Sequence, residues 1–140
     1  MQQVYSNSFL NISALASRGS DESLFVDRAA SALQEPRLQA AFRFDDIDPR
    51  LQEYRVIDHN FWKEEVHNAP LNRRGWVLQE RLLCPRVLHF GRQQLLWECC
   101  ELDAAEKYPN GLPEVILDNN SFARFKDLNA QSYCERMLYY

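Results

Sequence analysis

The sequence predicts an α/β fold, with an α+β arrangement of the elements present in these 140 residues. Two observations carry this prediction: an apolar helical period before Pro85, and two apolar runs on either side of Gly91. The first is typical of an amphipathic helix and the second of a β-hairpin. A chain of this length corresponds to one ordinary domain, which can bury a core without a metal or disulfides.

The composition is that of a globular protein and argues against two classes of function. The chain is 46% hydrophobic, with a formal net charge of -4 and a pI near 5.4. A cationic surface for nucleic acid is therefore not expected. No apolar run has the length of a membrane span, and the first residues do not resemble a signal peptide. We expect a cytoplasmic protein without nucleic-acid or membrane partners.

The clearest element is a helix expected over residues 73–83. Asn72 is expected to cap its first amides, and Pro85 to end it. Four residues lie three or four positions apart and share one face, which predicts the buried side of the helix: Leu71, Gly75, Leu78 and Leu82. Gln79 falls within this apolar arc. We therefore expect its amide to be buried and hydrogen-bonded, because an unpaired buried amide costs about 1–3 kcal/mol.

Two interpretations of Gln79 and Glu80 are open at this point. In the first, Gln79 bonds to a neighbouring backbone segment and Glu80 pairs with a surface arginine such as Arg73. In the second, both side chains line a pocket against Trp76. The first is favoured, because satisfied amides and ion pairs are more common than sites.

A hairpin is expected after the helix, with a two-residue type II′ turn at Gly91 and Arg92. Alternation along the strands puts their side chains on two mostly apolar faces, with Leu88, Phe90, Leu95 and Trp97 on one and Val87, His89, Leu96 and Glu98 on the other. A carboxylate on such a strand requires an arginine or a pocket. Arg81 or Arg86 is expected to pair with Glu98.

The other segments carry weaker signals. Residues 9–14 are expected to form a strand whose apolar side chains, including Phe9 and Ile12, are buried. Residues 54–58 are expected to form a second strand, and residues 60–69 a short helix with Trp62 and Val66 inside. After residue 100 an ordered loop is expected. Helical spacing recurs in the last twenty residues at Phe122, Phe125 and Leu128.

The stretch PLNRRGWVLQERLLCPRVLHFGRQQLLWEC, residues 70–99, closely resembles the final block of the fungal heterokaryon-incompatibility (HET) domain. The stretch VYSNSFLNISALAS resembles the family's middle block, and AAEKYPNGLPE resembles the segment that follows Trp-Glu-Cys. The residues at the family's two motifs are Trp76, Gln79, Glu80 and Arg81, then Trp97, Glu98 and Cys99. The family's first block, with its Trp-Ile-Asp strand, is not found. The resemblance therefore implies a fragment, the central and C-terminal part of a HET domain over residues 1–112, with a helical extension over residues 113–140.

The resemblance implies an α/β signalling domain, distantly similar to Toll/interleukin-receptor domains. Its implied role is non-self recognition and programmed cell death, exerted through protein partners or self-association. Relatives in that wider class cleave NAD with a glutamate. An alternative hypothesis is therefore that the intact parent domain is an NAD-type glycohydrolase. Glu80 and Glu98 are then the candidate catalytic residues. For this chain we expect no activity and no bound cofactor. A third hypothesis is that the chain is an inert truncated fragment.

The histidines and cysteines suggest two other kinds of site, a metal site and a Cys-His nucleophile pair, and neither is favoured. A metal site could draw on His59, His67, Cys84 and Cys99, yet no pair has the short spacing of a structural zinc site, so none is expected. A nucleophile pair of Cys99 with His89 is disfavoured because alternation puts them on opposite faces. Cys99 is expected to be a small core residue.

Overall fold

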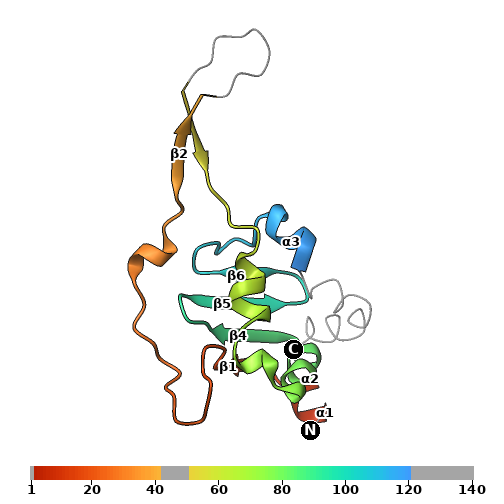
Figure 1. The fold of residues 1–140 in the computed structure, drawn as a ribbon. Coiled ribbons are helices and arrows are strands. Elements are labelled where there is room, and N and C mark those ends of the chain that lie inside the picture. Colours follow the sequence, from red (N-terminus) through yellow and green to blue (C-terminus); the bar gives the residue numbers. More distant parts are fainter. Residues whose placement is uncertain (1, 42–50, 121–140) are drawn as a thin grey trace.

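The computed structural model describes residues 2–41 and 51–120. Its body is a four-stranded sheet with helices packed against it, and a two-stranded ribbon extends from this body (Figure 1). The strands of the sheet are β1 (Asn11–Ser13), β4 (Arg86–Phe90), β5 (Leu95–Cys99) and β6 (Asp103–Ala105). This mixture of helices with a mixed sheet confirms the α+β fold class.

The sheet has the order β1-β4-β5-β6, with β1 parallel to β4 and the other pairs antiparallel. Ile12 lies opposite Leu88, which in turn lies opposite Trp97. Val87 lies opposite Glu98 and His89 opposite Leu96. The predicted division of the hairpin into two faces is therefore confirmed.

The predicted two-residue turn is wrong. Phe90 pairs with Leu95, which leaves a four-residue connection, residues 91–94. Gln94 explains the longer turn, since its carbonyl accepts from the Gly91 N–H at 3.1 Å and its side-chain Oε1 accepts from the Lys107 N–H at 3.1 Å. The buried Gln94 thus ties the turn to the segment after β6.

Helix α2 (Gly75–Leu83) ends where the sequence predicts, because Cys84 before Pro85 is extended, with φ -78° and ψ 129°. The predicted cap is wrong. The N-cap residue is Arg74, which makes no side-chain capping bond. Asn72 instead lies in the short turn η3 (Leu71–Arg73), and its Nδ2 donates to the Val66 carbonyl at 2.6 Å.

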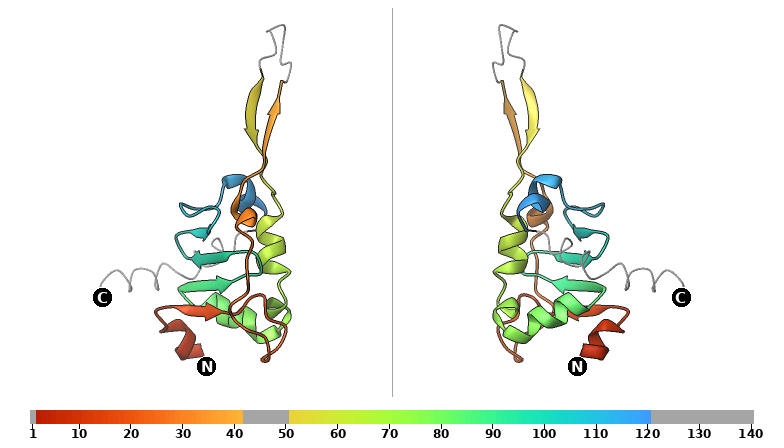
Figure 2. Two further views of the ribbon diagram at one scale, coloured as in Figure 1. Left: turned by 90° about the vertical axis from the view of Figure 1, so that its left-hand side faces the viewer. Right: turned by 90° about the vertical axis from the view of Figure 1, so that its right-hand side faces the viewer.

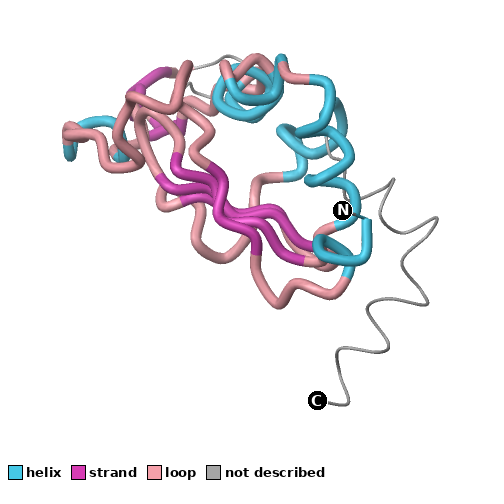
Figure 3. The backbone as a smooth tube through the Cα atoms, turned by 90° about the horizontal axis from the view of Figure 1, so that it is seen from below, coloured by secondary structure: helices cyan, strands magenta, loops and turns pink. Residues whose placement is uncertain are grey.

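The other elements are short. They are α1 (Gln2–Ser6), the 3₁₀ turn η1 (Ala30–Leu33), β2 (Arg37–Ala40), β3 (Gln52–Arg55), the π-helical turn η2 (Lys63–His67) and α3 (Glu114–Asn120). Two of them, β2 and β3, form the ribbon that extends from the body (Figure 1). The expected strand at residues 54–58 lies a few residues earlier, as β3, and the expected loop after residue 100 contains β6. Both side views place η2 and α2 on the same side of the sheet (Figure 2), and the view from below shows the same layering (Figure 3).

The core lies between η2 and the sheet. Trp62 and Val66 are buried there as predicted, and they pack with Leu15, Leu96, Tyr108 and Ile116, among others. The expectation for the first strand is wrong in one respect, since the strand exists but Phe9 and Ile12 are exposed. Phe122, Phe125 and Leu128 lie outside the described residues, and the boundary at residue 112 stays a prediction.

Candidate functional site

Three charged or titratable side chains from three elements meet beneath α2. Arg81 of α2 donates through Nε to Glu98 Oε2 of β5 at 2.5 Å, and His89 Nε2 of β4 lies 3.1 Å from the same oxygen. Their exposed fractions are 4%, 0% and 1%. The prediction that an arginine pairs with Glu98 is confirmed, with Arg81 as the partner. The two stretches that resemble family motifs thus meet in space through this buried pair.

The buried pair fixes the orientation of α2. Separating one member from the other would leave a charge without compensation in the interior, so the helix must present Arg81 to the sheet. Glu98 is sealed in this arrangement, and its carboxylate does not reach the surface. Glu80, the other predicted candidate, is half-buried and hydrogen-bonds to Tyr5 of α1, which raises the pKa of that phenol. The two glutamates therefore have different partners and do not share one cleft.

His67 of η2 lies close enough to this cluster to respond to its charges. Burial lowers the pKa of His67, and the positive charge of Arg81 lowers it further, while Glu98 acts in the opposite direction. His67 is therefore held toward its neutral form.

The opposite face of α2 is exposed, which reverses the predicted orientation of the helix. Trp76 is 77% exposed and Leu82 40%, and Leu78 and Gln79 lie on the same open side. The prediction that the Gln79 amide is buried is therefore wrong. The reason is that Arg81 is drawn inward by Glu98, and this turns the apolar arc outward. We call these four residues, Trp76, Leu78, Gln79 and Leu82, the α2 face.

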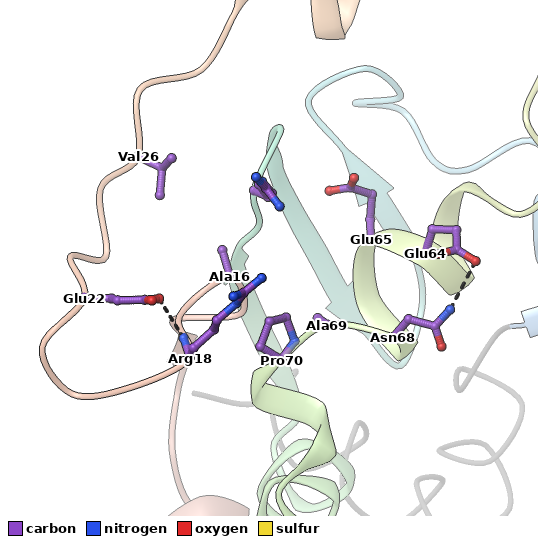
Figure 4. Close-up of a pocket in the computed structure, with 10 residues that line it drawn as sticks. Ala16, Arg18, Glu22, Val26, Glu64, Glu65, Asn68, Ala69 and Pro70 are labelled. Atoms are coloured by element: carbon purple, nitrogen blue, oxygen red, sulfur yellow. Dashed lines mark hydrogen bonds between the residues drawn. The ribbon is translucent and has the colours of Figure 1, made fainter.

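A cavity of about 490 Å³ lies at the end of the sheet, between the loop that follows β1 and the η2 helix (Figure 4). Arg18 and Glu22 line it from the loop, Glu65 and Pro70 from the η2 side, and Arg92 from the β4–β5 turn. Burial raises the pKa of Glu65, and the backbone amide of Gln93 and the charge of Arg92 oppose this less strongly. These residues were missed from the sequence, because they come from three separate segments that carry no shared motif.

The sheet places Cys99 and His89 on opposite faces, as predicted. Cys99 lies opposite Arg86, on the face away from His89, and its Sγ donates to the Leu102 carbonyl at 3.3 Å. Trp97, beside it, is half-buried. Among the described residues no group of three or more His, Cys, Asp or Glu side chains is placed to hold a metal ion. None of the helices described is both long and apolar enough to cross a membrane.

A family model described as heterokaryon incompatibility protein (HET) matches residues 1–80, more than half of the chain. The chain belongs to the HET family. The match covers the N-terminal part of the chain. The resemblance had implied the central and C-terminal part of the family domain, over residues 1–112 of this chain. The match includes Trp76, Gln79 and Glu80, which the resemblance assigns to a motif of the family, and ends before Arg81. The comparisons with curated proteins and with solved structures found no match.

Proposed function

We propose that this HET domain acts in non-self recognition and promotes programmed cell death in a fungal cell by associating with another protein. The α2 face is the surface that makes the contact. The proposal includes the distant similarity to Toll/interleukin-receptor domains that the resemblance implies. In this proposal the domain acts in the cytoplasm by binding other proteins.

The observation that carries the proposal is the exposure of Trp76 and its neighbours on α2. Tryptophan is enriched at the centres of protein interfaces, where truncating one such residue typically costs about 2 kcal/mol or more of binding free energy. Contiguous exposed apolar side chains are typical of interaction sites. The buried Arg81–Glu98 pair holds the helix so that this face points outward. A rigid helix with an open apolar face suits a partner that offers an apolar groove.

Inducible expression of the full chain in a filamentous fungus tests this proposal. The wild-type chain is expected to stop growth, and Trp76→Glu with Leu82→Glu is expected to restore it at equal protein level. Leu38→Glu is the matched control, since Leu38 is also an exposed leucine but lies on the β2–β3 ribbon. Growth arrest that persists in the double variant contradicts the proposal. Light scattering of the purified chain distinguishes self-association from association with a different protein.

The hypothesis of an NAD-type glycohydrolase predicts that the chain consumes NAD. A catalytic carboxylate must reach its ligand, and Glu98 is buried and paired, which leaves Glu80 as the candidate with access to solvent. Loss of NAD on incubation with the purified chain, abolished by Glu80→Gln, would favour the enzyme over association. The inert-fragment reading predicts thermal unfolding without cooperativity, which a melting curve of the chain measures directly.

A further inference from the structure

The cavity lies just beyond the carboxyl ends of the two parallel strands. β1 ends at Ser13 and β4 at Phe90, and the Ala16 N–H donates to the Phe90 carbonyl at 3.2 Å, which joins the two segments at that end. Residues that follow β1 and β4 line the cavity on two sides. In open α/β sheets, ligands bind in the crevice outside the carboxyl ends of the parallel strands, and this cavity has the same position relative to β1 and β4.

The loop that forms one wall is held in place, so the cavity is formed before any ligand arrives. The Phe25 ring packs edge-on against the Phe90 ring, with centroids 5.8 Å apart. Arg28 Nη2 donates to the Gly91 carbonyl at 3.3 Å. The Arg18 N–H donates to Glu22 Oε2 at 2.7 Å (Figure 4). A preformed wall reduces the entropy that a ligand must lose on binding.

Two guanidinium groups line the cavity, those of Arg18 and Arg92, and the charge of Arg92 also acts on Glu65. Neither the Arg18 nor the Arg92 guanidinium makes a hydrogen bond or close ion pair with any described residue, whereas Glu22 is occupied by a backbone amide. Guanidinium groups bind phosphate or carboxylate through paired hydrogen bonds. Two guanidinium groups that line the same cavity favour an anion as the ligand, and the double charge of a phosphate suits two arginines better than the single charge of a carboxylate does.

The side of the cavity formed by η2 supplies a carboxyl group, that of Glu65. Glu65 Oε2 is buried and has no hydrogen-bond partner among the described residues. Figure 4 shows the Glu65 carboxyl leaving η2 on the side that faces the loop with Ala16 and Arg18, while Glu64 bonds to Asn68. A buried oxygen without a partner is costly to the protein, so it favours a ligand that brings a hydrogen-bond donor.

We propose that this cavity binds a small phosphorylated polyol, such as a sugar phosphate. Arg18 and Arg92 bind its phosphate, and Glu65 accepts a hydrogen bond from one of its hydroxyl groups. The volume of about 490 Å³ lies within the range of small-molecule sites, and Ala69 and Pro70 supply an apolar floor. This binding does not depend on the α2 face.

Titration of the full chain with ribose 5-phosphate, followed by calorimetry and by NMR, tests the proposal. Saturable binding is expected, at least about tenfold tighter than that of inorganic phosphate or of free ribose. Arg18→Gln and Arg92→Gln are each expected to weaken it about tenfold. Both arginines are exposed, so these variants are expected to fold. Arg37→Gln is the matched control, an exposed arginine on the ribbon that is expected to leave affinity unchanged.

Glu65→Gln separates the role of the carboxyl from that of the arginines. The variant is expected to lose the preference for ribose 5-phosphate over inorganic phosphate while binding inorganic phosphate as the wild type does. Three results would overturn the proposal: no saturation up to about 10 mM ligand, equal weakening by Arg37→Gln, or equal affinity for the hydroxy acid gluconate. The last result would identify the cavity as a carboxylate site.

Discussion

Replacing Arg81 by methionine isolates the contribution of the buried pair beneath α2. The substitution keeps most of the side-chain volume and leaves Glu98 with a charge that has lost its main partner. Removing one member of a buried ion pair costs about 3–5 kcal/mol. His89 Nε2 lies 3.1 Å from the same carboxylate oxygen and stays in place as a second partner, so we expect the lower end, about 3 kcal/mol.

Urea unfolding followed by tryptophan fluorescence measures this loss. A domain of this size typically has a stability of about 5–15 kcal/mol, and m is about 1–3 kcal/mol/M, so the midpoint should fall by about 1–3 M. Arg81→Lys keeps the charge and should lose less. Arg73→Met is the exposed control and should stay within about 0.5 kcal/mol of wild type.

The double variant Arg81→Met with Glu98→Leu decides between a charge effect and a packing effect. Replacing both members by apolar residues is often close to neutral, so the double variant should be more stable than Arg81→Met alone. If Arg81→Met costs less than about 1 kcal/mol, or if the double variant loses the sum of both single losses, the argument that this pair orients α2 is refuted.

Three further predictions concern single positions. Glu65→Gln should raise the melting temperature at pH 7, because burial raises the pKa of the carboxyl and makes its ionised form unfavourable; the gain should vanish as the pH falls below the ordinary value of 4.5. His67→Gln should reduce the loss of melting temperature on acidification below pH 6.5, since the folded protein lowers the pKa of His67 and its protonation favours the unfolded state. Gly91→Ala should cost more than about 1 kcal/mol in urea unfolding, because the added Cβ would lie 2.7 Å from the backbone carbonyl oxygen of Gln94, which cannot move aside as a side chain can. Gly75→Ala meets no atom within 4 Å and should be neutral or stabilising.

The elements that the sequence predicts well are those whose signal is local. The end of α2 before Pro85 depends on one proline, and the two faces of the hairpin depend on alternation within ten residues. The orientation of α2 could not be predicted in this way. An arginine counts as polar on a helical wheel, and only its pairing with Glu98, seventeen positions later, draws it inward.

The cavity was missed for a related reason. Its arginines and carboxyl lie on the loop after β1, on η2 and on the β4–β5 turn, and only the parallel pairing of β1 with β4 brings them to one end of the sheet. Nothing in the local pattern around Arg18 or Glu65 distinguishes either residue from an ordinary surface charge. This site could therefore be predicted only once the pairing of β1 with β4 was known.

The parallel contact between β1 and β4 also has a consequence for the order of folding. β4, β5 and β6 are joined by short connections, so this meander can form early from neighbouring segments. Asn11 meets Val87 only after most of the chain between them has been enclosed, and the entropy of closing so long a loop delays that step. The first strand is therefore the last to join, and the pocket wall that follows it is completed only then.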